Sequence, residues 1–307
     1  MAITLALTPA FAVSKGNDSG QGKAVVTILP QKGKEMLAPV PVEDLQLKVG
    51  GKDSSVTGWT PLADAANRIE VVLLIDAGAQ TSLGTQFSSI QDFIQKLPQG
   101  AAVAVAYMAN GRALLAGPLT TDHTAALRGL RLPAGGSPGI SASPYFCLSD
   151  LAKNWPSKDR QARREVVMIT DGVDYYEEIY NPDDPYVLAA ISDALRSNLV
   201  VYSMYWGSRG GMDSTVYAAS TGQNLLEEVS EATGGMSYWM GLGNPVSLEP
   251  YFNDVALRMA HQYALEYVTD LKGGPGVENL KLQVKQTAGK VAAPTQTYVQ
   301  RKQESKQ

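Results

Sequence analysis

Two hydrophobic patterns divide the chain into a central stretch and two flanks. Between residues 63 and 262, near-continuous apolar runs such as IEVVLLID (69–76) and REVVMITDG (164–172) alternate with segments whose apolar residues recur at helical spacing. In residues 84–97, for example, Phe87, Ile90 and Ile94 share one face. Continuous runs predict strands covered on both faces, so this stretch predicts an α/β fold with a doubly wound, mainly parallel sheet.

Strict alternation of apolar and polar residues marks both flanks. Leu45, Leu47 and Val49 alternate before Gly50-Gly51, and residues 263–300 hold three further alternating segments. Neither flank has enough strands for a core of its own. We therefore expect residues 23–62 and 263–300 to pair into one β-sandwich, with the α/β unit of residues 63–262 inserted into it and residues 301–307 as a polar tail.

The first 22 residues predict an export signal followed by a disordered lead. The apolar run MAITLALTPAFA ends in Ala10-Phe11-Ala12, which is a small-x-small cleavage pattern. A Gly/Ser/Lys-rich stretch follows. We expect a protein that is secreted, periplasmic or held in the cell envelope, in which the single cysteine, Cys147, is buried and unreactive.

Composition narrows the class of partner. The net charge is −4 and the sequence shows no basic stripe, which argues against nucleic acid as a partner. No run of 18 apolar residues exists in the sequence, so it predicts no transmembrane segment. Two histidines, His123 and His261, leave little scope for a histidine-rich metal site. The sequence also lacks nucleotide-binding, nucleophile-elbow and HExxH motifs, and we expect no catalysis.

Two aspartates end separate strands of the predicted sheet. Asp76 closes the run 69–76, and Asp171 closes VVMITDG. Ligands of open α/β sheets lie beyond the carboxyl ends of the strands, where these two side chains would meet. Two carboxylates at one rim could share a divalent cation such as Mg²⁺ or Ca²⁺. Alternatively, both aspartates only form turns, as Asp-Gly at 171–172 suggests.

With these aspartates in place, the chain resembles the von Willebrand factor A domain, and more closely a bacterial VWFA-related family. The resemblance rests on VPVEDLQLKVGGK, LLEEVSEATGGMSYW and LRMAHQYALEYVTD, in this order around the two aspartates, and covers roughly residues 24–298. It implies a metal-ion-dependent adhesion site built from Asp-x-Ser-x-Ser, a threonine in a later loop and an aspartate in a T-D-G-like turn.

A comparison of this sequence with that motif, position by position, shows that the implied adhesion site is degenerate. Asp76 and Asp171 match its two aspartates, but Gly78 and Gln80 stand where the motif has serines. Either Ser137 or Ser143 could take the threonine position, and Ser143 before Pro144 also has the pattern of a helix N-cap. Loss of the hydroxyl ligands weakens coordination, so we expect at most a weak divalent cation.

Long polar loops at the same rim predict a recognition surface. The stretch VDYYEEIYNPDDPY (173–186) mixes tyrosines with acidic residues, and a second long polar segment spans 208–223. The residues expected to contact a partner are Gln80, Ser82, Asp174, Tyr175, Tyr176, Glu177, Tyr180, Asp183 and Asp184. The expected function is non-catalytic recognition of a protein or another cell-envelope macromolecule. Metal-dependent ligand binding and a structural part in a cell-surface assembly are the alternatives.

Overall fold

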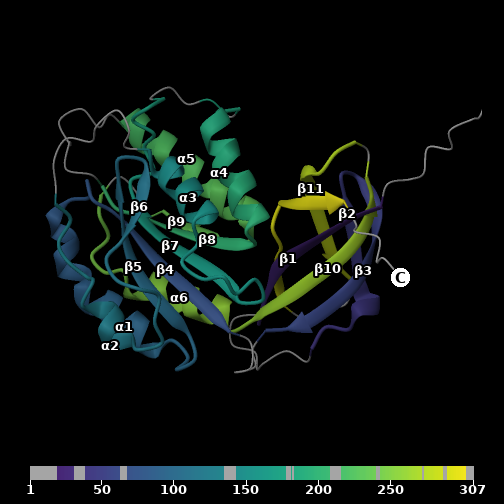
Figure 1. Cartoon of the computed structure of the whole chain (residues 1–307), viewed down its shortest axis with the longest axis horizontal. Coiled ribbons are helices and arrows are strands. Elements are labelled where there is room, and N and C mark those ends of the chain that lie inside the picture. The colour runs from purple at the N-terminus through teal and green to yellow at the C-terminus, as the bar shows by residue number, and fades with distance from the viewer. Residues whose placement is uncertain are drawn as a thin grey trace, which may run out of the picture.

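The computed structural model places the chain in two sheets that lie side by side (Figure 1). It describes residues 19–30, 39–62, 68–134, 143–177, 181, 183–207, 216–239, 243–271, 273–285 and 289–301. The export signal predicted near the N-terminus and most of the polar tail lie outside these residues.

The α/β unit confirms the predicted alternation of strands and helices. Its strands are β4 (Ile69–Asp76), β5 (Ala102–Ala109), β6 (Arg112–Leu115), β7 (Arg163–Thr170), β8 (Leu199–Tyr205) and β9 (Met236–Tyr238). Its helices are the 3-10 helix η2 (Thr81–Gln86), α1 (Phe87–Lys96), α2 (His123–Leu127), α3 (Pro144–Lys153), α4 (Pro185–Arg196), α5 (Val216–Thr233) and α6 (Glu249–Met259).

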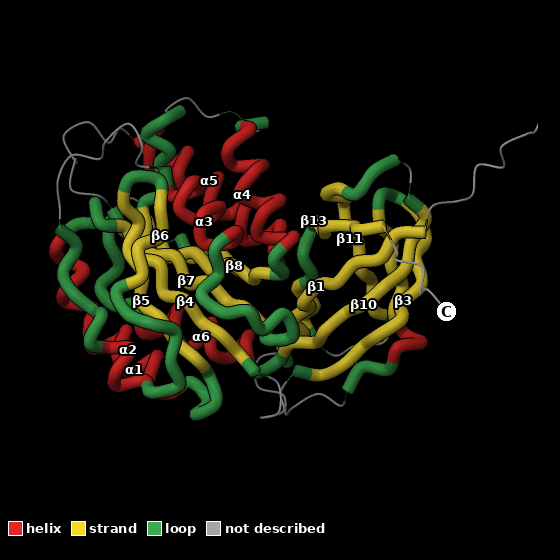
Figure 2. Tube along the Cα trace, viewed as in Figure 1, coloured by secondary structure: helices red, strands yellow, loops and turns green. Residues whose placement is uncertain are grey.

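The six strands form one sheet in the order β6-β5-β4-β7-β8-β9, and every pair is parallel except β5–β6. Figure 2 shows helices on both faces of this sheet. Odd-numbered residues of β4 such as Val71 pack with α1 and α6, and even-numbered residues such as Val72 pack with α3, α4 and α5. A strand buried on both faces needs apolar residues at every position, which explains the continuous runs.

The flanking strands form a closed barrel, so the predicted β-sandwich is wrong. The antiparallel strands are β1 (Ser19–Leu29), β2 (Leu45–Val49), β3 (Lys52–Pro61), β10 (Gln262–Asp270), β11 (Gly276–Val284), β12 (Lys290–Ala292) and β13 (Gln296–Arg301). Their order is β10-β3-β2-β11-β13-β1-β12, and β1 also pairs with β10. This extra pairing closes six strands into a ring, which leaves fewer free sheet edges than a sandwich has.

Both ends of the chain build this barrel. β1 pairs with β10 from Ser19↔Asp270 to Thr27↔Gln262, so residues more than 200 positions apart lie on neighbouring strands. The Gly50-Gly51 turn between β2 and β3 has φ values of +57° and +76°, which suit glycine. The 3-10 helix η1 (Val42–Asp44) precedes β2. β1 begins four residues before the expected boundary at residue 23.

The barrel adjoins the amino ends of the parallel strands. Arg163, at the start of β7, donates from Nη1 to the Met259 carbonyl and to Gln262 Oε1, the latter at the start of β10. Gln262 in turn donates to the Tyr202 hydroxyl. The carboxyl ends of the strands are therefore the ends that point away from the barrel.

Candidate functional site

Asp76 and Asp171 meet at the carboxyl rim of the sheet, as the strand pattern predicts. Asp76 is the last residue of β4, and Asp171 directly follows β7, the neighbouring parallel strand. Ile75 pairs with Ile169, so the next residues along the two strands, Asp76 and Thr170, are neighbours. The Thr170 hydroxyl donates to Asp76 Oδ2 at 2.8 Å, which ties the two strand ends together.

The two carboxylates influence one another electrostatically. Burial, and then the nearby charge of Asp171, raise the pKa of Asp76 to about 6, against the lowering effect of hydrogen bonds from Gly78 and Thr170. Asp171 is only 5% exposed. Its Oδ1 accepts from the Val173 amide at 3.0 Å, and its Oδ2 accepts from the Tyr175 hydroxyl at 3.1 Å.

The residues around this pair do not fit a tight Mg²⁺ or Ca²⁺ site. Gly78, at a serine position of the adhesion motif, donates its amide hydrogen to Asp76 Oδ1 at 2.7 Å. Gln80, at the second serine position, uses Oε1 to accept from Asn244 Nδ2. In the described part of the chain, no three His, Cys, Asp or Glu residues are grouped so as to hold a metal ion. Weak binding of a cation remains a prediction.

Of the two candidates for the threonine position, only Ser143 is described; Ser137 lies outside the described residues. Ser143 is the N-cap of α3, with Pro144 at the first helical position, as its sequence predicts. Its hydroxyl accepts from the Phe146 amide and donates to Asp174 Oδ2 at 3.0 Å. The hydroxyl proton of Ser143 therefore points to Asp174.

Asp174 and Asp184 have buried carboxylates that accept hydrogen bonds from backbone amides of their own segments. Asp174 is 1% exposed and accepts from the Tyr176 amide at 2.8 Å. Asp184 is 2% exposed, is the N-cap of α4, and accepts from the Tyr186 and Val187 amides. Like Asp76 and Asp171, both act as turn or cap residues that fix the backbone of the rim loops.

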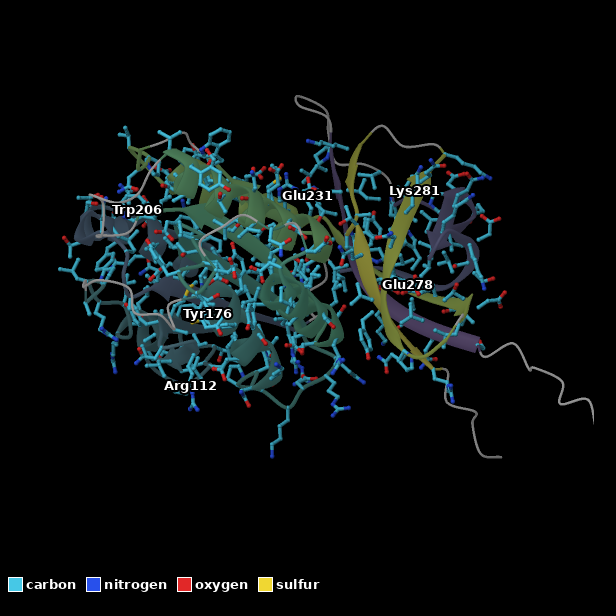
Figure 3. The ribbon with its side chains drawn as sticks, turned by 90° about the horizontal axis from the view of Figure 1, so that it is seen from above. Arg112, Tyr176, Trp206, Glu231, Glu278 and Lys281 are labelled. Atoms are coloured by element: carbon cyan, nitrogen blue, oxygen red, sulfur yellow. The ribbon has the colours of Figure 1, made fainter. Side chains whose placement is uncertain are left out.

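Three aromatic rings form a cluster beside these aspartates. Phe146, Tyr176 and Tyr186 pack edge to face, with ring centroids 4.9–5.4 Å apart. They come from α3, the loop after β7 and α4. Tyr176 remains 48% exposed, and Figure 3 labels it among the side chains of the α/β unit. Glu177 and Asp183 are exposed, as is Ser82 in η2, whereas Tyr180 lies outside the described residues.

Large exposed hydrophobic side chains lie around the same rim, and of these the sequence predicted only Tyr176 as a contact residue. Trp239 directly follows β9, Val216 and Tyr217 begin α5 after β8, and the Val246 carbonyl accepts from Gln86 of η2. With Leu132 and Tyr176, these residues are 48–98% exposed. They come from loops and a helix start that are far apart in the sequence, so no local pattern groups them. Exposed apolar residues gathered in one region mark an interaction site.

Helix α5 is packed against the Asp171 loop through a glycine. A Cβ atom on Gly222 would lie 2.3 Å from the Asp171 carbonyl oxygen and 2.9 Å from the Val173 amide nitrogen, so only glycine fits there. Helix α5 begins at Val216, within the segment 208–223 that the sequence predicts as a long polar loop. The described part of 208–223 is therefore helical and supports the rim from one side.

Cys147 lies in the core of the unit, as expected for an unreactive cysteine. It is unpaired and buried, and burial raises the pKa of its thiol to about 12. His261, which follows α6, places Nδ1 2.8 Å from the Leu257 carbonyl oxygen, in the position of a helix-end residue. Within the described residues, no helix is long and apolar enough to cross a membrane.

Comparison with known proteins gives distant structural similarities only. No protein-family model matches the sequence, and no curated protein matches it. The pilus adhesin SpaC from Lactobacillus rhamnosus GG in its open conformation is 10% identical, with a TM-score of 0.48 over 83% of this chain and 47% of its own.

Two further solved structures share this level of similarity. Proximal thread matrix protein 1 from the mussel byssus, whose MIDAS motif is occupied by zinc, is 14% identical with a TM-score of 0.43 over 69% of this chain and 50% of its own. The SpRpn10 VWA domain is 11% identical, with a TM-score of 0.40 over 62% of this chain and 97% of its own. The chain thus spans about half the length of SpaC and of the byssus protein. Similarities this weak transfer neither a ligand nor a residue's role.

Proposed function

We propose that the protein is an exported, non-catalytic recognition module that binds a partner protein of the cell envelope through the carboxyl rim of its α/β sheet. The observation that carries this proposal is the exposed aromatic and aliphatic surface at that rim, held by loops whose aspartates bond internally. Rigid loops lose little conformational entropy on binding, which favours affinity. The Ala10-Phe11-Ala12 pattern supports export.

The rim has the mixed chemistry of protein interfaces. Tyr176 offers a large apolar ring with a polar tip, and exposed Glu177 and Asp183 lie in the loops beside it. Tyrosine and tryptophan are enriched among the residues that dominate binding energy. Asp174 and Asp184 act through the backbone they hold, and Tyr175 through its bond to Asp171.

The two alternatives find less support. A metal-dependent ligand binder needs hydroxyl ligands at positions 78 and 80, where the chain has glycine and an already bonded glutamine. A structural role through open sheet edges is disfavoured by the closure of the barrel.

Tyr176→Ala tests the proposal. The wild-type protein is used as bait in an envelope fraction, the captured protein is purified, and its affinity is measured by calorimetry. We expect Tyr176→Ala to weaken this affinity by about 2 kcal/mol, roughly thirtyfold, because the ring is a central anchor. Val42→Ala removes an equally exposed hydrophobic side chain from the barrel and is expected to bind like wild type.

A chelator arm separates the rim surface from a metal site. Addition of EDTA should leave the affinity unchanged, since hydrogen-bond donors already satisfy Asp76 and Asp171. Loss of binding with EDTA would favour the metal-dependent alternative. Equal affinities of Tyr176→Ala, Trp239→Ala and wild type would rule out the rim as the contact surface.

A further inference from the structure

A cleft of about 1040 Å³ separates the α/β unit from the barrel at the amino ends of the strands. Its walls come from the C-terminal ends of α3 and α4, the loop 154–162, the start of β7, and β1, β13 and the turn before β11. Six cationic side chains line it: Lys23, Lys153, Lys158, Arg160, Arg164 and Arg196. The chain as a whole is acidic, so these positive charges are concentrated because the fold brings together residues that are distant in the sequence.

Three of these cations have structural partners. Lys23 pairs with Glu266 on the neighbouring strand. Lys153 pairs with Asp193 at 2.8 Å. Arg164 lies 3.8 Å from Glu70 and donates to the carbonyls of Ser157 and Asp159. Their charges are partly neutralised inside the protein.

The other three form no ion pair within the described residues. Arg196 stacks its guanidinium over the Tyr298 ring at 4.8 Å, and its place at the end of α4 suits the negative end of the helix dipole. Lys158 and Arg160 are exposed on the loop 154–162, and neither has an ion pair in the part of the chain that the structure describes. Among the described residues, neither a helix end nor an ion-paired carboxylate accounts for the positive charges of Lys158 and Arg160.

We propose that the cleft binds an acidic, Asp/Glu-rich segment of a partner protein. Carboxylates of such a segment would meet Lys158, Arg160 and Arg196, while amide and hydroxyl groups of Ser157, Gln161, Asn198 and Gln300 line the same walls and can bond a peptide backbone. The site is separate from the rim, because the rim lies at the carboxyl ends of the strands and the cleft at their amino ends. It therefore does not depend on the function proposed for the rim.

Single-stranded nucleic acid fits the cleft less well. Such ligands stack their bases on free aromatic faces. Trp155, the largest aromatic in the cleft, donates its indole N–H to Glu70 at 2.6 Å and has the Arg164 guanidinium 5.5 Å from its ring centroid. The acidic surface at the rim would also repel a long polyanion.

The test measures binding of a fluorescently labelled peptide of alternating Glu and Asp to the full-length protein by anisotropy at low ionic strength. We expect saturable binding that weakens as NaCl is added. Lys158→Glu combined with Arg160→Glu should weaken it by about tenfold or more, because two attractive charges become repulsive. Both residues are exposed, and thermal melts of the double variant check that its fold is intact.

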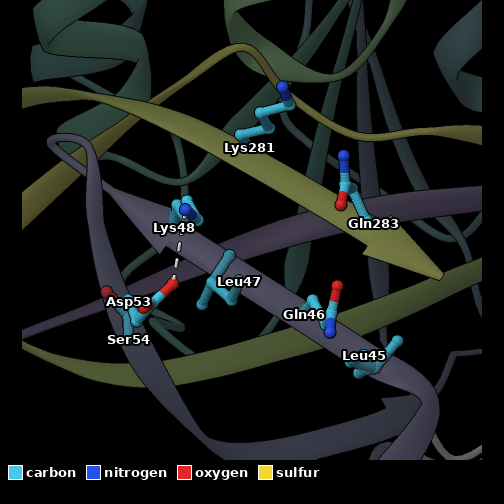
Figure 4. A pocket seen from close by; sticks show the side chains of 8 residues that line it. All are labelled: Leu45, Gln46, Leu47, Lys48, Asp53, Ser54, Lys281 and Gln283. Atoms are coloured by element: carbon cyan, nitrogen blue, oxygen red, sulfur yellow. Dashed lines mark ion pairs between the residues drawn. The ribbon is translucent and has the colours of Figure 1, made fainter. Parts of the chain in front are cut away.

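The matched control reverses two lysines far from the cleft, Lys96→Glu on α1 and Lys281→Glu on the barrel, which gives the same change in net charge. Figure 4 shows Lys281 beside a separate barrel pocket of about 570 Å³, in which Lys48 pairs with Asp53 at 3.6 Å. This control should bind the peptide with less than about a threefold loss. An equal loss in both double variants, or no saturable binding to wild type, would overturn the proposal.

Two further arms identify other occupants. A labelled single-stranded oligonucleotide that binds more tightly than the peptide, and loses affinity in the cleft variant, would replace the acidic protein segment with nucleic acid. Sedimentation velocity without peptide tests a second copy of this chain. Self-association that disappears in the cleft variant would assign the cleft to contacts between copies. We expect weaker oligonucleotide binding and no such self-association.

Discussion

Glu165 places an ionisable group in the interior of the α/β unit. The residue is fully buried on β7, and burial raises the pKa of its carboxyl from the ordinary value of 4.5 to about 7, against the lowering effect of Arg163. Arg163 Nε lies 3.6 Å from Glu165 Oε1, but Arg163 directs Nη1 to Met259 and Gln262 instead. Among the described residues, neither Glu165 oxygen has a hydrogen-bond partner of good geometry.

Glu165→Gln should therefore change how stability depends on pH. The folded state holds the Glu165 proton more tightly than the unfolded chain does. The contribution of this bound proton to stability is therefore complete below pH 4.5 and is lost as the pH rises through about 7. At pH 8 we expect Glu165→Gln to be more stable than wild type by about 2–3 kcal/mol, with little difference at pH 4. Urea unfolding at both pH values measures this, with Glu227→Gln, on the exposed face of α5, as control. A constant difference between variant and wild type would contradict it.

At the scale of helices and strands, α5 is constrained most tightly where it crosses the Asp171 loop. Gly222→Ala would place a methyl group 2.3 Å from the Asp171 carbonyl oxygen, and the neighbouring atoms are backbone that cannot rotate away. We expect a loss of about 1–3 kcal/mol, although alanine favours helix formation by about 1 kcal/mol. The measurement is urea unfolding monitored by circular dichroism.

Ser220→Ala supplies the helical control for this prediction. Ser220 is exposed on the same helix, so the substitution changes helix propensity without changing contact with the loop. It should be neutral or slightly stabilising. If Gly222→Ala were as stable as Ser220→Ala, the close contact between α5 and the Asp171 loop would be incorrect.

Elements with their own periodicity were predictable from the sequence, and elements defined by distant contacts were not. The buried strands β4 and β7 and the cap Ser143 follow from local pattern. The early start of α5 does not, because residues 218–224 are small or polar and become helical against the Asp171 loop. Closure of the barrel depends on the pairing of β1 with β10, which no local signal specifies.

The same distinction holds for the surfaces of the whole molecule. The meeting of Asp76 and Asp171 could be predicted because parallel strands bring their carboxyl ends to one edge. The basic cleft could not, because its cations come from β1, β7, α3, α4 and the loop 154–162, and the sequence shows no run of positive charge. Exposed Glu177 and Asp183 lie at one end of the sheet and the basic cleft at the other, so the two proposed sites together would hold two partners at once.

Such an arrangement requires that the barrel and the α/β unit remain fixed to one another, and Gln262 is central to that junction. It is 1% exposed. Its side chain accepts from Arg163 Nη1 at 2.6 Å and donates to the Tyr202 hydroxyl at 3.0 Å, and its backbone carbonyl accepts from the Leu62 amide. Gln262→Ala would leave Arg163 and Tyr202 with fewer partners in a buried place, and we expect a loss of about 3 kcal/mol. Because these bonds connect the two units, calorimetry should also show a broadened or divided unfolding transition where wild type shows a single one.

The control is Gln283→Ala, which changes an exposed glutamine on β11 and should unfold like wild type. A Gln262→Ala protein with the same melting temperature and transition width as Gln283→Ala would show that the two units are held together by other contacts.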